Sequence, residues 1–253
     1  MGPTYSIVIP AFNEELRLAK TLDQVIAFLQ QQHCKAEIVV VNDGSTDATA
    51  DIVRQYARSN SSLKLVENPG NRGKGFAVRN GMLNASGDIL LFTDADLSAP
   101  ITEAPKLVAA LQRGADVAIG SRWLDPSLQT QRQSVLRQVL GRVYNVVMRG
   151  LLGMQFRDTQ CGFKAFTRNA AHVVFPAQTI EGWGFDPEIL YLARRSGLRV
   201  EEVPVRWGHD TGTRIHPFRD GYQMLLDMVS IRWSAMRGVY VLPERGRAAR
   251  LAR

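Results

Sequence analysis

Cysteine is scarce in this sequence, and long uncharged apolar runs are missing. The two cysteines, Cys34 and Cys161, are far apart and neither lies in a Cys-x-x-Cys motif, which argues against a disulfide framework and a zinc site. The four histidines show no metal-ligand spacing, and only His209 and His216 remain site candidates. No stretch reaches the roughly 18 apolar residues that a membrane span needs. A strand-like segment begins almost at once, so we expect no secretory leader and a reduced, cytoplasmic setting.

The charge balance is positive, with 31 lysines and arginines against 24 aspartates and glutamates. This excess favours anionic partners, which include nucleotide phosphates, acidic lipid surfaces and nucleic acid. No nucleic-acid-binding motif is visible and aromatic residues are not interleaved with basic ones, so we expect no nucleic-acid partner. The length suits one large α/β unit. We predict a single domain over residues 1–240 and a basic tail over 241–253.

Strand and helix signals alternate through the first half of the chain. Apolar runs predict strands over 5–9, 37–41, 63–66, 89–93 and 117–120, and helical periodicity predicts helices over 14–32, 46–58, 76–84 and 102–112. Thr46 or Ser45 is expected to cap the second helix. Such alternation predicts a Rossmann-like, mostly parallel sheet flanked by helices.

Beyond Arg122 the pattern predicts a C-terminal helical extension. Helices are expected over 131–152, 187–196 and 217–233, with a strand over 199–205 and a strand-poor, glycine-rich stretch between the first two helices. The 131–152 segment combines an apolar face with spaced arginines, among them Arg132 and Arg137. It fits a helix in a membrane interface, and equally a core or oligomer helix.

Two carboxylates end a buried strand in the run Leu91-Phe92-Thr93-Asp94-Ala95-Asp96. Their i, i+2 spacing lets both side chains face one ion, and such hard oxygen ligands suit Mg²⁺ or Mn²⁺. Ligands of parallel sheets bind beyond the carboxyl ends of the strands, so Asn13, Asp43, Asp94 and Asp96 are expected on one rim. Considered alone, the motif is equally typical of a solvated turn.

Three further segments offer polar groups. Asp43 follows another strand, where it can accept a hydrogen bond from a base or ribose, or form an Asx turn. Gly73-Lys74-Gly75 lies at a helix start, which suits a phosphate contact or a plain basic loop. Asp186 and Glu188 lie near another helix start, where the helix dipole alone favours acids.

Together these segments resemble glycosyltransferase family 2, whose inverting members have a GT-A fold. The resemblance rests on residues 6–15, Asn42-Asp43-Gly44-Ser45-Thr46-Asp47, Gly73-Lys74-Gly75 and Asp94-Ala95-Asp96. Residues 158–166, 183–188, 203–207 and 216–220 are similar to the branch that glycosylates dolichyl and other polyprenyl phosphates. The similarity extends to about Arg237.

The resemblance implies a nucleotide-sugar donor, UDP-glucose in preference to a mannosyl donor, and a polyprenyl (dolichyl- or undecaprenyl-type) phosphate acceptor. It places the nucleotide and diphosphate near Pro10, Ala11, Phe12, Glu14, Asp43, Lys74 and Ala95. Asp94 and Asp96 would organise a divalent cation, Mg²⁺ or Mn²⁺. Eukaryotic members of the glucosyl branch have an N-terminal anchor and many bacterial relatives have C-terminal spans; this sequence shows neither, so membrane contact is expected to be peripheral.

The acceptor determines which catalytic groups are needed. A phosphate acceptor is already anionic and attacks the anomeric carbon without a general base, so positioning and electrostatics suffice. Arg122 is the first candidate to bind that phosphate through forked hydrogen bonds, followed by Arg132 and Arg137. A sugar or other hydroxyl acceptor would need a base, for which Asp186 or Glu188 is the candidate.

Overall fold

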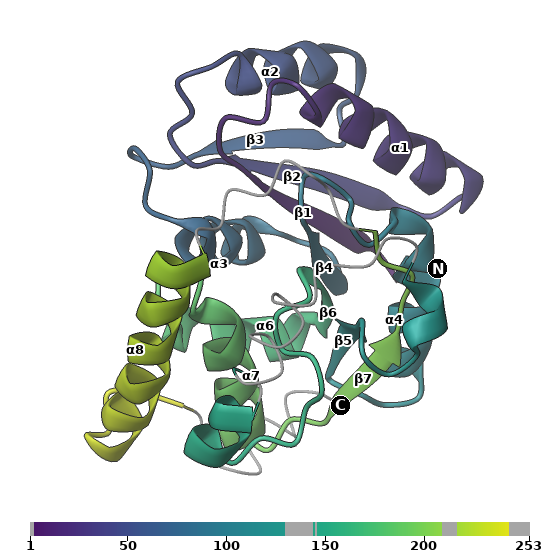
Figure 1. Cartoon of the computed structure of the whole chain (residues 1–253). Coiled ribbons are helices and arrows are strands. Elements are labelled where there is room, and N and C mark those ends of the chain that lie inside the picture. The colour runs from purple at the N-terminus through teal and green to yellow at the C-terminus, as the bar shows by residue number, and fades with distance from the viewer. Residues whose placement is uncertain (1–2, 130–143, 145, 209–216, 243–253) are drawn as a thin grey trace.

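A seven-stranded sheet forms the centre of the molecule (Figure 1). The computed structural model describes residues 3–129, 144, 146–208 and 217–242. The strand order is β3-β2-β1-β4-β6-β5-β7, with bounds β1 Tyr5–Ala11, β2 Ala36–Asn42, β3 Leu63–Glu67, β4 Ile89–Thr93, β5 Val117–Ser121, β6 Phe163–Thr167 and β7 Val200–Pro204. β6 runs antiparallel to both of its neighbours, and the other strand pairs are parallel. The prediction of a mostly parallel α/β fold is confirmed.

Helices cover both faces of the sheet (Figure 1). They are α1 (Leu18–Gln31), α2 (Thr49–Ser59), α3 (Lys74–Asn84), α4 (Ala104–Gln112), α6 (Arg168–Val174), α7 (Phe185–Arg195) and α8 (Pro217–Met236), with short 3₁₀ turns η1 (Ile101–Glu103), η2 (Pro126–Leu128) and η3 (Phe175–Ala177). Residues 146–152 are also helical. Apolar stripes on α1, α2 and α4 pack on one face, and those of α3, α6, α7 and α8 belong to the core on the other.

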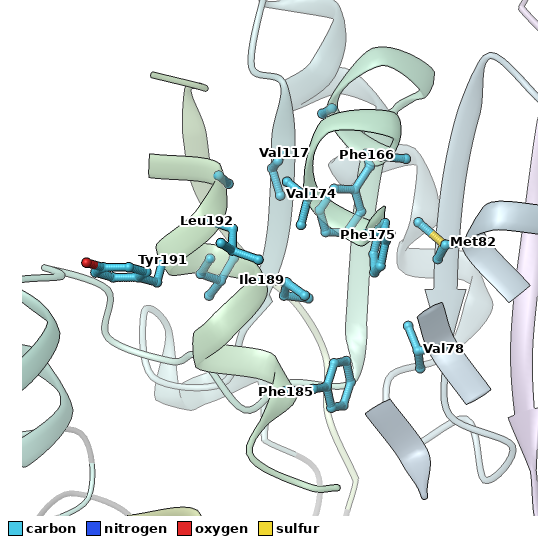
Figure 2. Close-up of a cluster of buried hydrophobic side chains, with 14 of the residues drawn as sticks. Val78, Met82, Val117, Phe166, Val174, Phe175, Phe185, Ile189, Tyr191 and Leu192 are labelled. Carbon is cyan, nitrogen blue, oxygen red and sulfur yellow. The ribbon is translucent and has the colours of Figure 1, made fainter. Parts of the chain in front are cut away.

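Aromatic rings connect the centre of the sheet to α7. The rings of Phe92 and Phe166, on adjacent strands, lie 6.5 Å apart between centroids. Phe185, the first residue of α7, lies 6.0 Å from Phe92, and Phe175 lies 5.1 Å from Phe166. Figure 2 shows Phe166, Phe175 and Phe185 among the buried side chains of this cluster. The packing therefore fixes the N-terminal end of α7 relative to the end of β4.

Strand β6 and helix α6 were not predicted from the sequence. β6 is only five residues long, and its second residue is Lys164. A lysine inside a short apolar run obscures the strand pattern, and only partners distant in sequence make its burial tolerable. α6 follows directly because Thr167 Oγ1 accepts a hydrogen bond from Ala170 N (3.2 Å) and caps the helix.

The start of α2 also differs from the prediction. Thr46 donates its backbone N–H to Asn13 Oδ1 (2.8 Å), and Ser45 Oγ accepts from Asn13 N (2.9 Å), so both residues bind the β1 loop instead of capping the helix. Asp47 Oδ1 accepts from Thr49 N (3.0 Å) at the first turn of α2. The prediction of Thr46 or Ser45 as the cap is wrong, because both residues hydrogen-bond to Asn13 in the loop after β1 instead.

Over the described residues, every helix is too short or too polar to cross a bilayer. The candidates Arg132, Arg137, His209 and His216, and the tail beyond residue 242, lie outside the described residues.

Candidate active site

Polar segments follow three neighbouring parallel strands at one edge of the sheet. Asn13 follows β1 with a φ of 51°, Asp43 follows β2, and Asp94 follows β4. The hydrogen bonds of Asn13 to the 45–46 turn join the first two segments. Asp43 N donates to the carbonyl of Ala11 (2.8 Å), which continues the β1–β2 pairing into the loops. The structure thus places the predicted rim residues on loops at the same sheet edge.

The Asp94-Ala95-Asp96 segment turns sharply after β4. Ala95 is buried and its carbonyl accepts a hydrogen bond from Thr21 of α1. Leu97 N donates to Asp94 O (3.1 Å) with Leu97 at a φ of 47°, a left-handed conformation that is uncommon for leucine. This anchored turn leaves the two carboxylates half-buried at the edge of the sheet.

Lys74, the first residue of α3, contacts the Asp94 carboxylate. Its Nζ lies 2.5 Å from Asp94 Oδ1 and 5.1 Å from the centre of the Trp183 ring. Burial by itself lowers the pKa of Lys74, but the carboxylates of Asp94 and Asp186 outweigh burial and raise that pKa. Lys74 is therefore a cation at neutral pH, and it adds positive charge beside the two acids.

Asp96 has an environment that disfavours its ionised form. Burial raises the pKa of Asp96, and the nearby Asp94 carboxylate raises it further. A divalent cation would relieve this repulsion between two hard oxygen donors. In the described part of the chain no cluster of three or more His, Cys, Asp or Glu residues forms a metal site. The pair fits an ion such as Mg²⁺, which commonly uses one or two carboxylates together with substrate phosphates and water.

Gly162 provides the space that Asp94 occupies. It precedes β6, whose Phe163 pairs with Thr93 of β4. A Cβ atom built on Gly162 would overlap the Asp94 carboxylate. Glycine is needed at this position because another segment approaches closely, not because of an unusual φ.

Lys164 and Asp186 form a buried ion pair behind the two acids. Lys164 Nζ donates to the Asp186 carboxylate and to Cys161 O (2.6 Å), and it lies 5.3 Å from the centre of the Phe92 ring. Lys164 is fully buried and Asp186 is 3% exposed. Burial raises the pKa of Asp186, although the positive charges of Lys164 and Lys74 counteract part of the effect. The buried pair thus extends the charge network that begins at Lys74 and Asp94.

Arg122, directly after β5, is held by a buried carboxylate. Its Nε and Nη2 each donate to Asp158 at 2.7 Å, and its backbone N donates to the same side chain at 2.9 Å. Asp158 is fully buried, and its backbone N donates to Glu202 (2.9 Å). The Arg122 guanidinium also lies 5.4 Å from the centre of the Trp207 ring. These contacts fix the orientation of the guanidinium.

Asp43 positions the loop that leads to Lys74. Its carboxylate accepts hydrogen bonds from Asn68 Nδ2 (2.7 Å), Arg72 N (3.1 Å) and Gly73 N (2.8 Å). Only 3% of Asp43 is exposed. Asp43 therefore stabilises the loop that precedes α3.

The Gly73-Lys74-Gly75 run packs closely against the segment before α7. Cβ atoms built on Gly73 and Gly75 would overlap the carbonyls of Glu181 and Ile180, respectively. Phe76 N donates to Glu181 O (3.0 Å). The glycines thus bring α3 against the 180–182 segment, while Lys74 extends to the carboxylates.

The other predicted donor contacts lie at the end of β1. Pro10 and Ala11 are the last residues of the strand, and Phe12 is half-buried in the following loop. Glu14 pairs with Arg17 (2.7 Å). The structure groups these residues at the same edge as Asp43.

Glu188 has a different environment from Asp186. Its Oε1 accepts from Thr179 N (3.0 Å), Thr179 Oγ1 (2.6 Å) and Tyr240 Oη (2.9 Å), and its Oε2 accepts from Ile180 N (2.9 Å). The side chain is fully buried. It holds the 179–180 segment onto α7, and Asp186 is the acid of this helix that belongs to the charge network.

The sequence pattern by itself predicts no role for Lys164 or for Asp158. A lysine between Phe163 and Ala165 is a visible signal, because lysine is rarely buried without a partner. The sequence does not name that partner, since Asp186 is 22 residues away. Asp158 lies 36 residues from Arg122, and the pair forms only in the folded sheet.

A family model described as "Glycosyl transferase family 2" matches residues 6–175. The dolichyl-phosphate beta-glucosyltransferase of Dictyostelium discoideum is 36% identical over 248 residues, which cover 93% of this chain and 76% of that protein. The enzyme of the same name from Drosophila melanogaster is 39% identical over 242 residues, which cover 89% of this chain and 73% of its own.

Among solved structures, glucosyl-3-phosphoglycerate synthase from Mycobacterium tuberculosis is similar in fold. Its complex with Mn²⁺, uridine diphosphate and glucosyl-3-phosphoglycerate matches with a TM-score of 0.64 at 23% identity, covering 97% of this chain and 82% of that one. The likeness confirms the predicted GT-A type fold. With the family model and the relatives, it leads to one assignment: the chain is a glycosyltransferase and belongs to glycosyl transferase family 2.

Proposed function

We propose that this protein transfers glucose from UDP-glucose to a polyprenyl phosphate of the dolichyl or undecaprenyl type, with inversion at the anomeric carbon. The main structural support is the Lys74–Asp94 ion pair beside Asp96, at the sheet edge where a nucleotide diphosphate would bind. The relatives named dolichyl-phosphate beta-glucosyltransferase resemble the chain over most of its length, which favours the same donor sugar and acceptor class.

The donor half of the site would use the ends of β1, β2 and β4. Pro10, Ala11, Phe12, Glu14 and Asp43 are proposed to border the nucleoside, with Ala95 beneath the diphosphate. Asp94 and Asp96 would hold a divalent cation, Mg²⁺ or Mn²⁺, which when bound neutralises charge on the leaving diphosphate. Lys74 supplies a fixed positive charge to the same group. The Mycobacterium tuberculosis structures contain uridine diphosphate with Mn²⁺ or Mg²⁺, which supports this cation class.

The acceptor half would use Arg122. Asp158 fixes the guanidinium before any ligand arrives, so little side-chain entropy remains to be lost on binding. A polyprenyl phosphate is anionic at neutral pH and needs no general base. Glu188 is occupied by four hydrogen bonds and Asp186 by Lys164, so neither acid is an uncommitted base. Because the acceptor is a membrane lipid, we place the enzyme at the cytoplasmic face of a membrane in peripheral contact.

An acceptor assay tests this proposal. Purified protein is incubated with UDP-glucose, Mn²⁺ and either a short-chain polyprenyl phosphate, the matching unphosphorylated alcohol, or a panel of free sugars. We expect glucolipid only with the phosphate, and loss of turnover in Asp94→Asn and Asp96→Asn. Transfer to the alcohol or to free sugars would reject the phosphate acceptor. Full turnover in both aspartate variants would reject the cation site.

A further inference from the structure

Helix α8 exposes a continuous apolar face. Its members are Tyr222, Leu225, Leu226, Val229, Trp233 and Met236, and we call this set the α8 stripe. Between 39% and 65% of each residue is exposed. With 3.6 residues per turn, the six positions fall within an arc of about 100°. Isolated exposed apolar residues are ordinary, but a contiguous group along about four helical turns marks a contact surface.

The opposite side of α8 fixes the helix to the protein. Met228, Ile231 and Ala235 are buried in the same core as α7. The carboxylate of Asp227 accepts a hydrogen bond from the backbone N of Gly184, the residue that precedes α7. Figure 1 shows α8 at the outer edge of the molecule, and it packs beside α7. The α8 stripe therefore points away from the core and has a fixed orientation relative to the candidate active site.

Two arginines border the α8 stripe. At the same angular spacing, Arg232 lies about 20° beyond one edge and Arg237 about 20° beyond the other. Both are exposed, and the Arg237 guanidinium lies 4.6 Å from the centre of the Trp233 ring. Tyrosine and tryptophan favour membrane–water interfaces, and arginines beside an apolar face can extend to lipid phosphates. The one acid of the described residues 221–236, Asp227, is directed to Gly184 instead.

We infer that the α8 stripe docks on an anionic bilayer, with α8 lying in the interface parallel to the membrane. The inference rests on the proposed function, because a polyprenyl phosphate presents its reactive group at a bilayer surface. Charge complementarity favours lipid over a second copy of this chain, since the stripe is bordered by arginine on both sides and the protein has a net charge of +7. The Asp227–Gly184 contact connects this surface to the start of α7, where Asp186 lies.

Vesicle flotation tests the inference. Full-length protein is mixed with phosphatidylcholine vesicles that contain or lack phosphatidylglycerol. We expect binding that requires the anionic lipid and weakens with salt. The triple variant Leu226→Gln, Val229→Gln, Trp233→Gln should bind at least about tenfold more weakly, and each of Arg232→Gln and Arg237→Gln about fivefold. Leu16→Gln is the matched control, because Leu16 is 96% exposed near the start of α1, on the other side of the sheet from α8. Circular dichroism verifies that all variants are folded.

The outcomes separate this inference from the proposed function. Equal vesicle binding by the wild type and the triple variant overturns the inference, even if glucosyl transfer is normal. A wild-type dimer that the triple variant converts to a monomer, without any vesicle binding, overturns it in favour of a second copy. Transfer to a short polyprenyl phosphate in solution should be unchanged in the triple variant, whereas transfer to a long-chain polyprenyl phosphate in vesicles should fall about tenfold. Absence of transfer by the wild type to either acceptor rejects the proposed function alone, because flotation is scored without turnover.

Discussion

The ammonium group of Lys164 donates a hydrogen bond to the carboxylate of Asp186, and both side chains are buried. Lys164 comes from β6, which runs antiparallel to β4 and β5, and Asp186 from the first turn of α7. The pair therefore joins the sheet to the helix that borders the candidate active site. A buried pair of this kind is costly to break on one side, because the remaining charge loses its partner.

Lys164→Met should destabilise the protein by about 3 kcal/mol, because it leaves the Asp186 carboxylate buried without its cation. Urea unfolding measures this change. The double variant Lys164→Met, Asp186→Leu should recover most of the lost stability, since neither charge then remains. If the double variant is as unstable as the single one, Lys164 stabilises the fold by packing and not by charge pairing.

Gly162→Ala should reduce turnover while it preserves most of the folding stability. The added methyl group would overlap the Asp94 carboxylate, which must move from the position that it shares with Lys74. We expect kcat/KM to fall about a hundredfold, as when one preorganised electrostatic contact is lost. Gly150→Ala is the control, because a Cβ atom at Gly150 meets no other atom within 4 Å. Normal turnover in Gly162→Ala would show that the Asp94 position is not critical.

Arg122→Lys should weaken acceptor binding although it keeps the positive charge. Lysine cannot reproduce the forked contact with Asp158, so its ammonium would be less well oriented. We expect the KM for polyprenyl phosphate to rise about tenfold with an unchanged KM for UDP-glucose. Asp158→Asn should give the same pattern, because it releases Arg122. A rise in the KM for UDP-glucose instead would show that Arg122 contacts the donor and not the acceptor.

Glu37 should give the protein an acid-dependent stability unrelated to catalysis. Burial by itself raises the pKa of Glu37, but hydrogen bonds from Lys64, Ser6 and Ser86 outweigh it and lower that pKa from 4.5 to about 2. A lowered folded-state pKa contributes stability above the unfolded-state value, and this contribution is lost as the pH falls toward the folded-state pKa. Its size is about 2 kcal/mol after allowance for partial solvent access.

Denaturant unfolding of wild type and Glu37→Gln at several pH values measures this contribution. The wild type should be more stable at neutral pH, and the difference should shrink between about pH 4.5 and pH 2. Ser86→Ala should reduce the difference at neutral pH, since it removes the hydrogen bond that the Ser86 hydroxyl donates to Glu37 and keeps the one from its backbone N. A pH-independent difference between wild type and Glu37→Gln would show that the ionised carboxylate is not responsible.

The local pattern of apolar residues is enough to predict the parallel half of the fold. β1, β2 and β4 each contain a run of consecutive buried apolar residues, and the helices between them bury apolar side chains against the sheet. Their periodicity predicts the elements, and the handedness of parallel crossovers brings their polar ends to one edge. For that reason the sequence alone predicts Asp43 and Asp94 at the same edge.

Tertiary structure determined the remainder. Lys164 interrupts the apolar pattern of β6, so the sequence does not predict this strand. Its burial is tolerable because its ammonium group hydrogen-bonds Asp186 and Cys161 O, which lie outside the strand. Likewise threonine is a residue type that suits a helix cap, yet Thr46 donates its backbone N–H to Asn13 in the loop after β1 and does not cap α2. The Asp94-Ala95-Asp96 turn was readable as a metal motif from its spacing, whereas its pairing with Lys74 and the gap left by Gly162 were not. Spacing along the chain limits which groups can meet, but contacts between distant segments determine which charges are paired once water is excluded.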